Sequence, residues 1–432
     1  MPSLDPDASI LRRNFLCMLI PVGINQAALN TVLVYASTVQ QHTVGYTGSA
    51  VLNVASMVSS LTLASFIIER IGVKGGIIVG MSLSAVYIFC SAVATDTCAN
   101  FRSDGTCDRA STTQWLTFVI GSATGGLATG IIWSSQGTAF ARYAHLEAEV
   151  RDQPAEEVSA ELAGLFAFAY LSAEMLLKAV SSLLIKLAGM KASTLFYMYA
   201  AVAAVPMIST ILATPPASAP SRVHVCAKVA AAVAIWPDVK LWLLAFTNLT
   251  FGFSAAFMNG YVNVHYAAHD LGADALGFLS AATVLAAVLS TRVYALIPQK
   301  SLVAFLGSIF FALVAIIAQG DVIRLWSLSS WGWGLTVLYA LQGFGRGVYE
   351  STNKSIFADV FPCARYPGFF ANVIMQNSFA FTICFFLSDY ITKQLGWIVF
   401  SLAVFTYPSM VVALHLKCRQ DRQSEDAAPV LG

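Results

Sequence analysis

Twelve apolar runs of about 20 residues dominate this sequence. An α-helix needs roughly that length to cross a hydrocarbon core of ~30 Å. The runs are too long for barrel strands, and backbone groups in lipid must bond within their own segment, so helices are the expected form. Only 11% of the 432 residues are charged. We therefore predict an all-α polytopic membrane protein with twelve transmembrane helices, which cover residues 14–39, 47–68, 76–95, 114–140, 161–185, 193–213, 240–263, 274–296, 301–320, 332–357, 368–390 and 396–416.

The positive charges along the chain predict its orientation in the membrane. If the chain crosses twelve times, most of its 24 Lys and Arg residues lie on the side of the N-terminus. Cytosolic segments normally carry this excess. Both termini are therefore expected in the cytosol, and the protein in the plasma membrane or an endomembrane. A formal net charge of +1 gives no sign of nucleic-acid binding.

A segment rich in Pro and small residues, followed by basic ones, separates six spans from six. It reads as a cytosolic linker between two bundles. The predicted domains are an N-terminal six-helix bundle at 1–213, a linker at 214–239, a C-terminal six-helix bundle at 240–417 and a cytosolic tail at 418–432.

The two halves also resemble each other in sequence. "LATGIIWSSQGTAF" (127–140) laid over "FGRGVYESTNKSIF" (344–357) pairs Gly130 with Gly347, and a serine and a phenylalanine match further along. A six-span unit that was duplicated predicts this correspondence of span 4 with span 10. Chance similarity between apolar segments that contain Gly and Ser is the alternative.

The connection between the second and third spans, "ERIGVKGG" (69–76), is short and basic. Gly72 suits a tight turn, and Glu69, Arg70 and Lys74 surround it. The pattern resembles the conserved loop of the major facilitator superfamily, which couples helix movements at the cytosolic gate. An ordinary loop on the positive side of the membrane is the alternative.

Two longer segments point to one branch of that superfamily. "GLATGIIWSSQGTAFARYA" (126–144) and "FGFSAAFMNGYVNVHYAAHDLGADALGFL" (251–279) resemble the uncoordinated-ninety-three family of ion-channel regulators. The resemblance implies the major facilitator fold, with two six-helix pseudo-repeats. Two functions are then open: alternating-access transport of a small solute or ion, or a non-transporting role as the regulatory subunit of a potassium channel or the trafficking partner of a membrane receptor.

Two pairs of opposite charges lie within predicted spans. Arg346 and Glu350 are four residues apart, as are Glu174 and Lys178, so each pair shares one helix face. A charge at the bilayer centre costs roughly 2.5 to 3.5 kcal/mol on insertion scales and normally faces a partner or a hydrated cavity. Each pair either lines a central cavity or neutralises itself and locks its helix to neighbours. Glu174 could exchange protons or cations, although Lys178 favours its charged form.

Polar amides gather in the spans that line the central cavity of the superfamily. They either line such a cavity or form hydrogen bonds between helices, which are worth about 0.6 kcal/mol on average. Trp133 either stacks or packs. The amide candidates are Asn25, Gln26, Asn30, Gln136, Asn248, Asn259, Asn263 and Asn353.

Cys98 and Cys107 flank a short polar segment in the loop expected outside, where a disulfide is predicted. His265 and His269 stand four apart, but with no further ligands we predict no metal site. The glycine-rich segments follow no strand, so no nucleotide loop is expected. No cofactor and no enzymatic activity are predicted. The expected partners are the lipid bilayer, a small solute or cation of unknown identity, and a channel or receptor.

Overall fold

The computed structural model describes residues 6–102, 106–213, 225–353, 356–357, 360–361 and 366–426, and these are almost entirely helical. In this part of the chain, nine helices are long and apolar enough to cross a membrane. They coincide with nine of the predicted spans and confirm the all-α polytopic class. These helices are Ser9–Val39, Phe66–Asp96, Thr112–Arg151, Glu161–Ala188, Ala192–Leu212, Val239–Leu271, Ala273–Tyr294, Lys300–Val322 and Thr392–Arg422.

The three other predicted spans are also helical. They correspond to α2 (His42–Leu61), to α13 (Thr336–Val348) with the π-helix η5 (Tyr349–Asn353), and to α15 (Tyr366–Leu387). Helix α2 begins at His42, ahead of the predicted start at residue 47. The side chain of Gln41 accepts a hydrogen bond from the Val44 amide there and caps the helix.

The chain divides into two compact units. The first comprises Met1–Lys228 and Asn259–Val284, and the second comprises Val229–Met258 and Leu285–Gly432. The division falls inside the π-helix η1 (Met258–Ala267) and inside α11 (Leu276–Ala295). The domain boundaries expected from the sequence remain a prediction.

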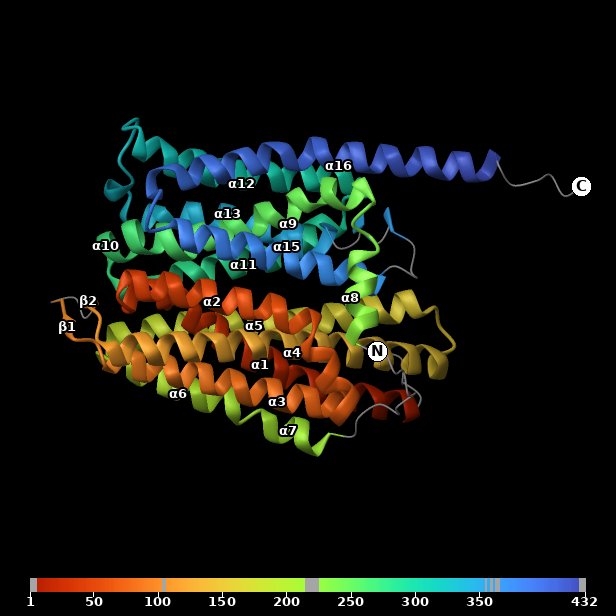
Figure 1. Ribbon diagram of the computed structural model, residues 1–432, viewed down its shortest axis with the longest axis horizontal. Helices are drawn as coiled ribbons and strands as arrows, with labels where there is room; N and C mark the ends of the chain where they lie inside the picture. Colours follow the sequence, from red (N-terminus) through yellow and green to blue (C-terminus); the bar gives the residue numbers. More distant parts are fainter. Residues whose placement is uncertain are drawn as a thin grey trace, which may run out of the picture. The chain divides into compact units, whose positions relative to one another are not determined.

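The first unit is built mainly from helices that pack side by side, with α4 against α2 and α3, and α1 against α5 (Figure 1). Pro206 separates α6 from α7. The elements are α1 (Pro6–Val39), α2, α3 (Leu63–Asp96), β1 (Asn100–Phe101), β2 (Cys107–Arg109), α4 (Thr112–Arg151), α5 (Ala155–Ala188), α6 (Ala192–Ala204), α7 (Met207–Leu212), α10 (Ala268–Leu271) and η2 (Ala273–Ala275).

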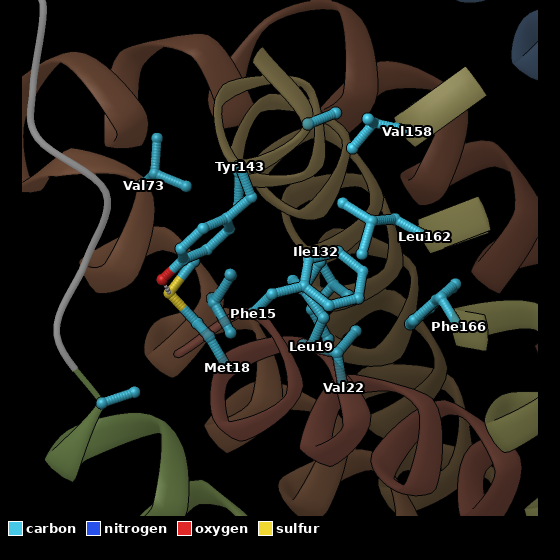
Figure 2. Packing of buried hydrophobic residues seen from close by; sticks show 14 of the residues in the cluster. Phe15, Met18, Leu19, Val22, Val73, Ile132, Tyr143, Val158, Leu162 and Phe166 are labelled. Carbon is cyan, nitrogen blue, oxygen red and sulfur yellow. Dashed lines mark hydrogen bonds between the residues drawn. The ribbon is translucent and has the colours of Figure 1, made fainter. Parts of the chain in front are cut away.

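One hydrophobic cluster of this unit joins α1, α3, α4 and α5. Phe15, Leu19 and Ile132 lie at its centre, and Phe166 marks its edge (Figure 2). Tyr143 points its hydroxyl at the sulfur of Met18. The cluster fixes α5 beside α1 and α4, which matters because α5 carries the charged pair described below.

In the second unit, α16 packs against α9 and α12, and α15 packs against α9. A core that includes Leu241, Leu244 and Met410 joins these helices. The elements not yet bounded are α8 (Val225–Val233), α9 (Val239–Phe257), α12 (Lys300–Val322), η3 (Leu328–Ser330), η4 (Gly332–Leu335), η7 (Thr392–Gln394) and α16 (Leu395–Asp426).

The matched glycines of the sequence repeat occupy equivalent packing positions. A Cβ at Gly130 on α4 would lie 2.6 Å from the Ser60 amide nitrogen of α2. A Cβ at Gly347 on α13 would clash with Ser290 of α11. Small residues let transmembrane helices approach closely. Span 4 thus meets span 2 as span 10 meets span 8, which supports the six-span repeat.

Two local expectations concern loops. Cys98 and Cys107 form the predicted disulfide, with Cα atoms 5.9 Å apart, and Cys107 is the first residue of β2, which pairs with β1. Gly72 has a φ of 76° and a ψ of 172°, as a tight turn requires, so the range labelled α3 consists of two helical segments that meet at this residue. A Cβ at Gly76 would lie 3.5 Å from Ile68 Cγ1, so the chain turns back on itself within the predicted connection at 69–76, and Thr62 marks only a kink between helical segments.

Candidate functional site

Four side chains at intervals of four form a row along one face of α5. They are Phe166, Tyr170, Glu174 and Lys178. Phe166, Glu174 and Lys178 are buried, and Tyr170 is half-buried. We call these four residues the α5 row.

The α5 row ends in the predicted charged pair. Lys178 Nζ lies 2.6 Å from Glu174 Oε1. The side chains are 6% and 1% exposed, so this ion pair is removed from water. Removing only one partner of such a pair leaves an uncompensated buried charge, which typically costs 3–5 kcal/mol, a large part of the total stability of many domains.

Aromatic rings surround the other end of the row. Tyr170 and Phe166 stack with centroids 6.2 Å apart. Trp133 of α4 meets both rings edge-on, at 6.4 Å from Phe166 and 5.9 Å from Tyr170. Asn30 of α1 donates a 2.7 Å hydrogen bond to the Tyr170 hydroxyl. Trp133 and Asn30 are both half-buried. The row therefore joins a buried ion pair to an aromatic cluster with one fixed hydroxyl.

The second charged pair is looser. Arg346 Nε lies 3.8 Å from Glu350 Oε1, and the side chains are 14% and 31% exposed. Glu350 lies on η5, where the helix widens into a π-turn. Such turns are frequent at functional sites. The two pairs belong to different units.

Asn25 and Gln26 serve as hydrogen-bond links between helices of the first unit. Asn25 Nδ2 donates to the carbonyls of Met81 on α3, at 3.2 Å, and Ala203 on α6, at 2.9 Å. Gln26 Nε2 donates to Asn25 Oδ1 and to Ser84. These contacts match the interhelical alternative for both residues.

Three amides form a chain in the second unit. Asn353 Nδ2 donates to Asn248 Oδ1 at 3.3 Å, and Asn248 Nδ2 donates to Gln376 Oε1 at 2.7 Å. The chain joins η5, α9 and α15. A cavity of about 30 Å³, lined by Asn353, Thr250 and other residues, lies beside it. That volume suits one or two water molecules.

The other amide candidates lie in the first unit. Gln136 is buried on α4, and Asn259 is half-buried on η1. Asn263, also on η1, is fully buried and donates to the Val34 carbonyl at 3.2 Å.

The residues around Gly72 divide into two groups. Glu69 and Arg70 are exposed, and the Arg70 guanidinium lies 5.4 Å from the centre of the Phe66 ring. Lys74 instead donates to the carbonyls of Ile211, at 2.5 Å, and Ala213, at 2.8 Å. A cation at these terminal carbonyls of α7 satisfies acceptors that the helix itself leaves open.

Sequence reasoning missed several of these groups. Phe166 and Tyr170 precede Glu174 at the spacing of the charged pair, so extending that interval toward the N-terminus finds them. Gln376 carries no comparable signal, because only the fold brings α15 to α9. Within the described residues, no group of three His, Cys, Asp or Glu could hold a metal ion.

No protein-family model matches the sequence, and no curated protein matches it either. Solved structures do resemble its fold. The xylose transporter XylE from E. coli, in a partially occluded inward-open conformation, matches with a TM-score of 0.63 and 13% identity. The match covers 93% of this chain and 96% of that one. A mutant of the nucleoside transporter NupG matches with a TM-score of 0.61 and 11% identity, over 91% of this chain and 99% of that one.

A bacterial homologue of the human drug peptide transporters PepT1 and PepT2 matches with a TM-score of 0.62 and 12% identity, over 97% of this chain and all of that one. At these identities the likeness concerns the fold. The chain is a multi-pass membrane protein with the major facilitator fold. None of these matches bears on the narrower resemblance to the uncoordinated-ninety-three family.

Proposed function

We propose that this protein is a secondary transporter that moves a small polar solute by alternating access, and that the α5 row is part of its solute site. The proteins of similar fold are named as transporters of xylose, nucleosides and peptides. Solutes of these kinds are small and polar, which supports the class of function.

The observation that carries the proposal is the buried pair of Glu174 and Lys178. Well-packed apolar residues of similar volume are often at least as stabilising as a buried ion pair. Ionisable residues inside a membrane are costly and are functional-site candidates by default, with substrate and ion pathways among the sites they mark. The aromatic cluster beside the pair adds surfaces that can pack against a solute.

A set of four variants in proteoliposomes tests this role against a purely structural one. The single changes Glu174→Gln and Lys178→Met each leave one charge buried and should lower both stability and flux. The double change to Gln and Met removes both charges, so it should recover most of the stability. Lys191→Met is the control, because Lys191 is exposed at the start of α6.

The readouts are the apparent melting temperature in detergent and the counterflow of a labelled sugar, nucleoside and amino acid. A stable double variant without flux supports the solute site. A double variant that is both stable and fully active assigns the pair to helix packing. If the folded wild type moves none of the three solutes, the transporter proposal fails and the regulatory role implied by the family resemblance becomes the better account.

A further inference from the structure

The α5 row presents two chemistries in a fixed order. Its ion pair lies at one end and its aromatic rings begin one helical turn away. At 1.5 Å per residue, Tyr170 lies roughly 6 Å and Phe166 roughly 12 Å from Glu174 along the helix axis. A solute that contacts both ends therefore combines charged groups with an apolar part a few ångströms away.

The charges restrict the solute further. Glu174 and Lys178 together carry no net charge and are buried. A solute with a net charge would add a charge that the pair does not compensate, and buried charges without partners are costly. A zwitterion avoids this cost, because its ammonium can face Glu174 while its carboxylate faces Lys178. In an α-amino acid both groups are attached to one carbon, so they lie as close together as the two side-chain tips.

The aromatic end suits the apolar part of such a solute. Phe166 belongs to the hydrophobic cluster (Figure 2), and Tyr170 and Trp133 pack against that cluster but are only half-buried. The hydrogen bond from Asn30 fixes the Tyr170 ring in place. Rings held in this way can stack with a further aromatic group or meet it edge-on. Each such pair contributes about 0.5–1.5 kcal/mol of favourable free energy beyond the burial of apolar area.

We infer that the solute is a zwitterion with a large apolar side group, of the amino-acid type. Glu174 binds its ammonium, Lys178 its carboxylate, and Tyr170 with Trp133 its side group. The inference rests on the proposed function, whose solute site it specifies. A sugar offers hydroxyls but no charged group. It therefore gives neither Glu174 nor Lys178 a new opposite charge when the ion pair between them opens.

Direct binding of tritiated phenylalanine to the purified protein tests the inference. The competitors are 3-phenylpropionate, which lacks the ammonium, 2-phenylethylamine, which lacks the carboxylate, glycine, which lacks the ring, and xylose. Unlabelled phenylalanine should compete, and each of the others should compete at least tenfold more weakly. Absence of phenylalanine binding, or equal competition by xylose or by either singly charged analogue, overturns the inference.

Variants of the two charged residues test the inference through the order of preference among the analogues, which a purely structural role of the pair would leave unchanged. In Glu174→Gln the competition should shift toward 3-phenylpropionate, and in Lys178→Met toward 2-phenylethylamine, each by about tenfold relative to phenylalanine. Tyr170→Leu should weaken the binding of phenylalanine but leave the competition by glycine unchanged. Variants whose preference among the analogues equals that of the wild type overturn the assignment of the two charges, whatever their stability.

Counterflow in proteoliposomes separates this inference from the proposed function. Phenylalanine binding with the shifts above, but without counterflow, keeps the zwitterion site and overturns transport. Counterflow of xylose or a nucleoside without phenylalanine binding keeps transport and overturns the zwitterion site.

Discussion

Gly130 and Gly137 lie on the same helix, two turns apart, in opposite surroundings. A Cβ at Gly130 would press on the backbone of α2, whereas a Cβ at Gly137 would meet none of the described residues within 4 Å. Ser59 of α2 also donates a 2.9 Å hydrogen bond to the Leu127 carbonyl at this contact. Close approach of the two helices thus depends on a missing methyl group at one position and not at the other.

We expect Gly130→Ala to lower the free energy of unfolding by about 1–3 kcal/mol, because the backbone of α2 must move to admit the methyl group. Gly137→Ala is the matched control and should raise it by about 1 kcal/mol through helix propensity alone. Melting of the two variants in the same detergent compares them. Equal effects of the two changes would show that the α2 contact is not tight.

For the buried amides, the sequence predicts that each side chain needs a hydrogen-bond partner but not which residue provides it. Amides in lipid need partners, and the structure gives one to each of Asn25, Asn248 and Asn353. The identity of those partners depends on how helices meet, which no local pattern records. The same limit applies to the aromatic half of the α5 row, whose rings are ordinary apolar residues until Trp133 lies beside them.

At the scale of elements, Lys74 connects α3 to the end of α7. Lys74→Met removes both bonds to the carbonyls of Ile211 and Ala213. We expect amide exchange across Met207–Ala213 to become several-fold faster, because the terminal carbonyls of α7 lose their side-chain donor.

Arg70→Met provides the control for this change, since Arg70 lies on the same bend but is exposed and contacts Phe66. Its exchange pattern in α7 should match the wild type. Unchanged exchange in the Lys74 variant would show that α7 is held by its apolar packing alone.

A second connection between elements is a chain of charges at the ends of α1, α4 and α5. Arg151 contacts Glu147 at 3.1 Å and Glu161 at 2.8 Å, and Glu161 also contacts Arg12. Glu147 is fully buried, and its Oε2 atom has no hydrogen-bond partner among the described residues. Arg151 thus supplies the positive charge that compensates the buried negative charge of Glu147.

Arg151→Gln should therefore lower the free energy of unfolding by about 3–5 kcal/mol, the usual result of stranding a buried charge. Adding Glu147→Gln should restore much of the loss. Arg12→Gln should cost no more than about 1 kcal/mol, because its pair with Glu161 is partly exposed. Thermal unfolding of the three variants checks the order, and equal losses in Arg12→Gln and Arg151→Gln would contradict it.

The helical spans themselves were predictable, because hydropathy is a local property of about 20 residues. The turn at Gly72 was also predictable, because glycine adopts a positive φ freely, but the π-turns η1 and η5 were not. In a π-turn the backbone hydrogen bonds span five residues instead of four. A helix interrupted in this way looks the same in sequence as one that is not.

For the whole molecule, the cysteines offer a test of the predicted orientation. Cys98 and Cys107 form the disulfide expected outside, and Cys418 is exposed near the end of α16, expected inside. In intact cells, an impermeant reductant should open the disulfide, and an impermeant maleimide should then label Cys98 and Cys107 but not Cys418. Cys418 should react after permeabilisation, and its labelling in intact cells would overturn the orientation.

The division of the chain into units has a consequence for its biosynthesis. The first unit includes Asn259–Val284, so its contacts are incomplete when the ribosome has finished the six spans before the linker. Asn263 and Phe278 reach back to Val34 and Ser182, residues made long before them. At ordinary synthesis rates the delay is on the order of several seconds. During that interval the nascent first unit must wait in the membrane with those surfaces uncovered, a stage at which insertion factors have time to act.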